Sequence, residues 1–159
     1  MQRAKGGAQK AAQSDGPPDP VLQFLRTVWQ LEHALERASK RMEDTLGISG
    51  PQRFALRIIG VRPGITAGDL AGVLHLHPST VTGILQRLQA RGLVKRTASA
   101  TDGRLVHLNL TAAGKRANKP SVRGTIEHAV RATLSRCPAP ARRSAASVMD
   151  RFAEELMKL

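Results

Sequence analysis

The sequence is poor in aromatic side chains: its 159 residues include no Tyr, one Trp and three Phe. Proteins that coat single strands of nucleic acid stack bases on aromatic rings, so this composition argues against that class. One cysteine, Cys137, excludes an internal disulfide and, with five scattered histidines, a classical structural zinc module. No apolar run approaches the roughly 20 residues that a membrane span needs, and residues 1–20 lack the apolar core of a signal peptide. We therefore expect a cytoplasmic protein.

Acidic residues are also scarce. Twelve Asp and Glu face 25 Lys and Arg, which gives a formal net charge of +13. Hydrophobic residues make up 41% of the chain, which is ordinary for a globular protein and unlike a disordered basic tail. The length suits one domain with a helical extension. The charge excess predicts a polyanionic partner, either nucleic acid or an acidic membrane surface.

The positive charge is concentrated in the middle of the chain. Residues 51–116 hold ten basic and two acidic side chains, a net charge of +8. Residues 21–50 are neutral, residues 117–159 carry +4, and residues 1–20 carry +1. The first 20 residues mix Gly, Ala, Gln and Pro without apolar periodicity, so we interpret them as a flexible leader. The middle is therefore the basic module, and the neutral stretch before it has a different role.

Apolar spacing predicts a mainly α-helical chain with one small β-hairpin. Pro51 and Pro78 suit the first position of a helix, Thr66 and Asp69 form a capping pattern, and Gly92 ends a helix. The predicted helices cover residues 21–46, 51–61, 66–74, 78–91, 111–134 with room for a kink at Pro120, and a last stretch including 145–159. The predicted strands are residues 93–97 and 105–110, joined by a polar turn. Two short helices followed by a hairpin are a helix-turn-helix candidate.

The helix predicted from residue 78 to residue 91 has one apolar and one polar face. Burying Val81, Ile84, Leu85 and Leu88 leaves side chains outward that can contact bases or phosphates. These candidate DNA-binding residues are Ser79, Thr80, Thr82, Gly83, Gln86 and Arg87. Gly83 would allow a close approach of the duplex. The alternative is a solvated helix face that is polar by chance.

The predicted hairpin adds a cationic edge beside this helix. Lys95 and Arg96 lie on its first strand, and Asp102 and Arg104 lie in its turn. An arginine on a narrow hairpin suits the minor groove, where negative potential is concentrated. We therefore add Lys95, Arg96 and Arg104 to the predicted DNA-binding residues.

Residues 46–116 resemble the winged helix-turn-helix of the MarR family of bacterial transcriptional regulators. The resemblance rests on short motifs that are weak singly and specific in this order. They are Pro51-Gln52, Thr66 to Leu74, Ser79-Thr80-Val81-Thr82, Leu88, Arg91-Gly92-Leu93-Val94-Lys95-Arg96, Asp102-Gly103-Arg104 and Leu110-Thr111-Ala112-Ala113-Gly114. One departure is Gly83, where the family commonly has an arginine or another polar residue, so Gln86 and Arg87 would carry more of the contact.

The resemblance implies a homodimer that binds a near-palindromic operator in double-stranded DNA. After the flexible leader (1–20), it implies an N-terminal dimerisation helix (21–46), a winged helix-turn-helix domain (47–116) and C-terminal dimerisation helices (117–159). In the family, the aspartate at Asp102 stabilises the wing through an arginine, for which Arg96 is the candidate here, and Arg104 reaches DNA. A repressor released by a small-molecule effector is the implied mode of action.

Other residues carry weaker signals. Phe24, Trp29 and His33 are candidates for an effector pocket, although a tryptophan at helical spacing more often lies in a core or a dimer interface. Cys137 stands at a proline-rich helix boundary without a second cysteine, so we interpret it as structural or incidental. His75 and His77 make only two ligands of a metal site, and a pH-dependent DNA contact is as plausible. A metal or ligand site between His33 and His128 is less favoured than a solvated helix face, and we expect no metal or cofactor.

Two other functions fit the same charge. An architectural protein that coats DNA with little specificity would use the phosphates alone. A winged-helix module that binds an acidic protein would use the basic face without DNA, which the outward Ser, Thr and Gln side chains suit poorly. We expect no enzyme, because the sequence has no phosphate-binding Gly-rich loop, no clustered metal ligands and no nucleophile motif.

Overall fold

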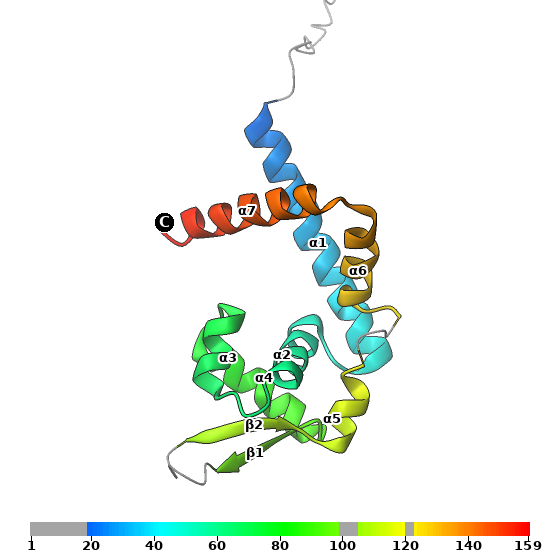
Figure 1. Cartoon of the computed structure of the whole chain (residues 1–159), viewed down its shortest axis with the longest axis vertical. Coiled ribbons are helices and arrows are strands. Elements are labelled where there is room, and N and C mark those ends of the chain that lie inside the picture. Colours follow the sequence, from blue (N-terminus) through cyan, green and yellow to red (C-terminus); the bar gives the residue numbers. More distant parts are fainter. Residues whose placement is uncertain (1–18, 99–104, 120–122) are drawn as a thin grey trace, which may run out of the picture. The chain divides into compact units, whose positions relative to one another are not determined.

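The computed structural model describes residues 19–98, 105–119 and 123–159, and these residues are mostly helical (Figure 1). Contacts divide the chain into two units, residues 1–33 and 34–159, and the boundary falls within the first helix, α1 (Pro20–Leu46). Among the described residues no helix is long and apolar enough to cross a bilayer.

The second unit contains the elements predicted for a winged helix-turn-helix. Its elements after α1 are α2 (Gly50–Val61), α3 (Ala67–Leu74), α4 (Pro78–Ala90), β1 (Val94–Ala98), β2 (Val106–Leu110), α5 (Ala112–Ala117), α6 (Ile126–Arg136) and α7 (Ala139–Leu156). Helix α4 packs against α2 and α3, and the β1–β2 hairpin contacts all three helices (Figure 1). The fold class predicted from the sequence, mainly α with a small β-hairpin wing, is confirmed.

Local capping explains where the two helices before α4 begin. Ser49 and Gln52 form a reciprocal capping box around the first turn of α2, with Pro51 inside that turn. The Thr66 hydroxyl oxygen accepts a hydrogen bond from the Asp69 backbone N–H at 3.1 Å, as the capping pattern predicted. These bonds satisfy amide donors that the helix itself cannot pair, so the sequence fixes both starts locally.

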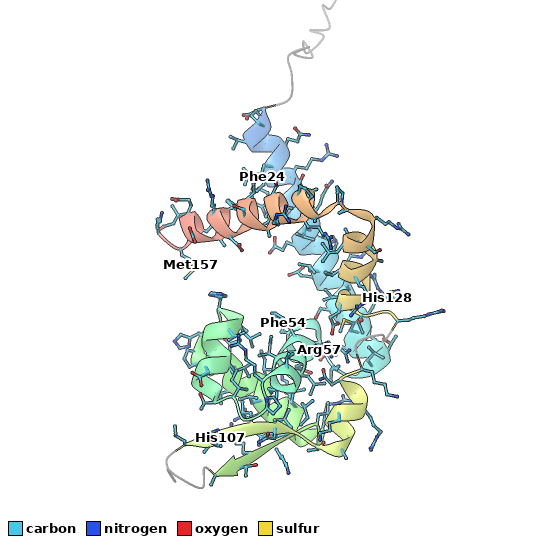
Figure 2. The ribbon with its side chains drawn as sticks, viewed as in Figure 1. Phe24, Phe54, Arg57, His107, His128 and Met157 are labelled. Atoms are coloured by element: carbon cyan, nitrogen blue, oxygen red, sulfur yellow. The ribbon has the colours of Figure 1, made fainter. Side chains whose placement is uncertain are left out.

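The two strands pair antiparallel and are joined to the helices by a third extended segment. Val94 faces Leu110 in the hairpin register, and Ile65, just before α3, forms a bridge with Leu108 of β2. The ring of His107, labelled on β2 in Figure 2, lies with Nδ1 2.6 Å from the Gly64 carbonyl oxygen. The wing is therefore attached to the α2–α3 connection as well as to the end of α4.

One core holds these elements together. Its buried apolar residues come from α2, α3, α4, both strands and the segments between them: Ile48, Ala55, Leu56, Ile59, Ile65, Leu70, Ala71, Val81, Ile84, Leu85, Leu88, Val94 and Leu108. Four of them are the stripe that the sequence predicted for the helix from residue 78. Burial of this stripe orients α4, so its opposite face is turned to solvent.

The single helical stretch predicted from residue 111 to residue 134 is wrong. Helix α5 ends at Ala117, and α6 begins only at Ile126, after its N-cap Thr125. The Thr125 hydroxyl oxygen accepts a hydrogen bond from the His128 backbone N–H at 3.2 Å, which fixes the new start. Arginine side chains from α2 hold the backbone carbonyls beyond α5, so the chain leaves the helical path before Pro120.

Candidate nucleic-acid interface

Helix α4 presents the predicted polar residues on its exposed face. Its buried residues are Val81, Ile84, Leu85 and Leu88. Of the six predicted residues Gly83 is half-buried, and the other five are exposed: Ser79, Thr80, Thr82, Gln86 and Arg87. One element therefore brings all six predicted residues of the helix onto one accessible surface. We call this surface, residues 79, 80, 82, 83, 86 and 87, the reading face.

Hydrogen bonds at the start of α4 orient two hydroxyl groups of the reading face. The Ser79 Oγ lies 2.7 Å from His77 Nδ1, and the Thr82 hydroxyl donates to the Pro78 carbonyl at 2.9 Å. When the His77 proton is on Nε2, Nδ1 is an acceptor and the Ser79 hydroxyl donates to it. Both hydroxyl groups then have lone pairs left to accept bonds from outside, such as the amino groups of adenine or cytosine.

Gly83 interrupts the reading face with an open position. A Cβ atom built on Gly83 meets no heavy atom within 4 Å. The fold therefore does not need glycine there, although glycine inside a helix is less stable than alanine by about 0.5–1 kcal/mol. The gap lies among side chains that can reach base edges. A molecule outside the chain could approach the helix closely at this position.

The described part of the wing is basic on its first strand. Lys95 and Arg96 are exposed on β1, where they pair in register with Asn109 and Leu108. Asp102 and Arg104 lie outside the described residues, and Ala98, predicted as the start of the turn, is the last residue of β1. The predicted pairing of Arg96 with Asp102 and the DNA contact of Arg104 stay predictions.

Sequence reasoning missed a buried charged cluster on α2. Arg53 has a side chain only 2% exposed, and its Nε donates to Glu127 Oε1 of α6 at 2.8 Å. Its Nη2 donates to the Lys119 carbonyl at 2.7 Å, and its Nη1 donates to the Ala117 carbonyl. Arg57 (Figure 2) donates to the Asn118 carbonyl at 2.6 Å. We call Arg53, Arg57, Glu127 and residues 117–119 the arginine junction.

A signal for this cluster was present in the sequence. The two arginines are four residues apart, on the side of α2 that also carries buried Leu56. From the sequence alone both contribute only to the basic charge, because arginines are mostly exposed. Their partners are 61–74 residues away in the chain, so no local pattern could have identified them.

The remaining candidates are placed as follows. Phe24 is half-buried, His33 is exposed and Trp29 is 61% exposed, so Trp29 is not a core residue of the single chain. An effector pocket or a dimer interface remains a prediction for these three residues. Cys137 is half-buried at the end of α6. In the part of the chain that is described, no group of three His, Cys, Asp or Glu side chains could hold a metal ion.

Comparison with known proteins assigns the helix-turn-helix part of the chain to a family. The sequence profile of the MarR family matches residues 46–105, which contain α2 to β1. The chain is 28% identical over 110 residues to the HTH-type transcriptional repressor Rv2887 of Mycobacterium tuberculosis, covering 69% of this chain and 78% of that protein. Within the chain, residues 46–105 belong to the MarR family. The protein is a transcriptional regulator with a DNA-binding winged-helix fold, and the MarR family is not one of enzymes.

Two solved structures of regulators share the fold of this chain. One is the MepR–DNA complex of Staphylococcus aureus, with a TM-score of 0.69 and 16% identity over 83% of this chain and 97% of that one. The other is PcaV of Streptomyces coelicolor with its natural ligand, with a TM-score of 0.68 and 23% identity over 87% and 97%. The likeness in fold therefore extends beyond the winged helix to most of the chain.

Proposed function

We propose that this protein is a homodimeric, sequence-specific repressor that binds a near-palindromic operator in double-stranded DNA. The reading face of α4 is the main support for the proposal. The helix buries its apolar stripe in the core and exposes side chains that can contact base edges. In a dimer, each α4 enters one major groove and each wing lies beside it. The solved structure of MepR, which shares the fold, is a complex with DNA.

The charge distribution supports a duplex as the partner. Residues 51–116, which include the reading face and both strands, carry a net charge of +8. Lys95 and Arg96 on β1 extend the positive surface toward phosphates that flank the groove. Phosphate contacts supply affinity and base contacts supply specificity, and the protein has candidate residues for both.

Unpaired apolar surface on the helices outside the winged helix supports the dimer. Val130 and Leu134, four residues apart on α6, are 48% and 42% exposed. No residue of the 18-residue α7 is buried, although Val148 and Met149 give it an apolar side. Isolated helices of this length are marginal in water, so burial against a second copy would stabilise α7.

Release by a small molecule is the proposed regulation. PcaV was solved in complex with its natural ligand, and it shares the fold of this chain. Phe24, Trp29 and His33 of α1 are the proposed pocket residues, because they are the aromatic side chains of α1 and are partly or fully exposed. Aromatic ligands that bind there would quench or shift the fluorescence of Trp29, the one tryptophan, and would lower operator affinity.

We expect Gln86→Ala and Arg104→Ala to change DNA binding in different ways. Gln86→Ala removes a base-reading amide, so discrimination at one base pair per half-site falls by about 1–3 kcal/mol. Arg104→Ala removes a cation, so affinity falls for all sequences and the salt dependence becomes shallower by about one unit per site. Titrations of a selected duplex and its point variants at several salt concentrations measure both effects. A Gln86→Ala protein with unchanged base preferences would contradict the assignment of α4 as the reading helix.

Gly83→Ala is expected to stabilise the fold and weaken DNA binding together. The added methyl group meets no atom of the chain, and alanine favours the helix by about 0.5–1 kcal/mol. On DNA the same methyl group would occupy space at the groove, so affinity falls by about tenfold, a value within the range for one base contact. Thermal unfolding and duplex titration measure the two effects.

The matched control is Gly72→Ala on α3, where a Cβ also meets nothing within 4 Å. It should raise the unfolding free energy similarly and leave duplex affinity within about twofold of the wild-type value. If Gly83→Ala binds DNA as tightly as Gly72→Ala, the open position of the reading face does not contact DNA.

A further inference from the structure

The arginine junction lies between the DNA-reading part of the chain and its last two helices. Arg53 and Arg57 project from α2 and hold the backbone carbonyls of three consecutive residues, 117–119. These are the last residue of α5 and the two that follow it. Carbonyls at a helix end lack partners within the helix and carry partial negative charge, so two guanidinium groups suit them.

Glu127 completes the junction from the other side. It lies in the first turn of α6, with Oε1 2.8 Å from the Nε of Arg53 and 3.8 Å from the Nε of Arg57. Its second oxygen, Oε2, is buried without a hydrogen-bond partner among the described residues. One carboxylate therefore connects two turns of α2 to the start of α6.

Stability alone does not explain so many charges in this place. A buried ion pair contributes little more than well-packed apolar residues of the same volume, because removing both charges from water costs free energy. Planar guanidinium groups differ from apolar side chains in that they bind acceptors in fixed directions. Arg53 uses this property fully, with donors directed at α6, at residue 117 and at residue 119.

A continuous path leads from this junction to DNA. Helix α2 packs against α4, and both contribute to the single core. In the dimer proposed above, α6 and α7 contact the second copy, so the direction in which α6 leaves the winged helix sets the separation of the two α4 helices. We infer that Arg53 is a positioning residue that fixes the half-site spacing this regulator accepts. The inference rests on the proposed dimeric function.

The test compares spacing rather than affinity alone. Full-length protein is titrated with a duplex selected by the wild type, with the same duplex carrying one extra base pair between half-sites, and with a single half-site. One base pair moves the second half-site by about 3.4 Å and rotates it by about a tenth of a turn. A wild-type dimer with a rigid junction should lose at least about tenfold in affinity on this insertion.

The main variant is Arg53→Met combined with Glu127→Met, which removes both charges and leaves no unpaired partner between them. We expect this variant to lose less than about threefold in affinity when the extra base pair is inserted. Its affinity for a single half-site should stay within about twofold of the wild-type value. Arg53→Lys keeps the charge but cannot bind three acceptors in fixed directions. Its loss of affinity on insertion should therefore lie between those of the wild type and the double variant. Arg62→Met, at the exposed end of α2, is the control for the loss of one positive charge. It should discriminate between the two spacings as strongly as the wild type does.

Each result bears on one claim. Arg53 variants that fold and reject the extra base pair as strongly as the wild type would overturn the inference and leave the proposed function standing. If the double variant does not fold, Arg53→Lys decides. An Arg53→Lys protein that rejects the extra base pair as strongly as the wild type would also overturn the inference. A wild type that enriches no paired half-sites would overturn the proposed function, and the positioning role with it.

Discussion

A protein carrying both Met149→Glu and Leu156→Glu is expected to be monomeric and to bind its operator about 10²–10⁴-fold more weakly. Both residues lie on the apolar side of α7 and are 40% and 50% exposed. In the proposed dimer they are covered by the second copy, and a glutamate there would bury an unpaired charge. A monomer binds each half-site separately, so it loses the gain that comes from linking two contacts in one particle.

Sedimentation and duplex titration on the same samples measure this effect. Ser144→Glu with Ser147→Glu is the matched control, because it changes the charge equally on the opposite side of the same helix. We expect the control to remain dimeric and to lose only the few-fold affinity that two added negative charges cause. A dimeric Met149→Glu, Leu156→Glu protein would show that α7 does not form the interface in the way we propose.

Gly114→Ala is expected to destabilise the winged helix by about 3 kcal/mol or more. A Cβ atom at this position of α5 would collide with the Leu93 carbonyl oxygen and would lie 3.4 Å from the Leu110 Cβ. The carbonyl belongs to the backbone entering β1 and accepts a hydrogen bond from the Thr111 N–H at 3.1 Å, so it cannot move away cheaply. The wing and the start of α5 would have to separate.

Denaturant unfolding followed by circular dichroism measures this loss. Small domains are stable by about 5–15 kcal/mol in total, so the shift in midpoint should be large. Gly72→Ala again serves as the comparison, because its added methyl group meets open space. A Gly114→Ala protein as stable as the wild type would show that α5 does not pack this closely on the wing.

The parts of the fold that follow from neighbouring residues were predictable from sequence. The start of α3 at Thr66 and of α4 at Pro78 depends on capping within three residues, and the buried stripe of α4 depends on spacing within one helix. The reading face consists of residues of α4 that lie outside this stripe, so it was predictable too. The resemblance to the MarR family then supplied the meaning of that face, which spacing alone did not.

The parts that depend on distant residues were not predictable. The sequence predicts only a kink where α5 and α6 separate, because the side chains that hold residues 117–119 come from α2, more than 60 residues earlier. Arg53 was missed for the same reason, since its burial depends on acceptors that only the folded chain brings to it. The open position at Gly83 is visible in the sequence as a departure, but its freedom from clashes needed the structure.

The proposed regulator reads a paired sequence in duplex DNA. The most direct measurement is selection from a random duplex library by the wild-type protein at physiological salt. We predict enrichment of a near-palindromic motif with half-sites about one helical turn, roughly 10 base pairs, apart. Retention of duplexes without any enriched motif would indicate an architectural protein, and no retention even at low salt would indicate a partner other than DNA. Either result would contradict the proposed function.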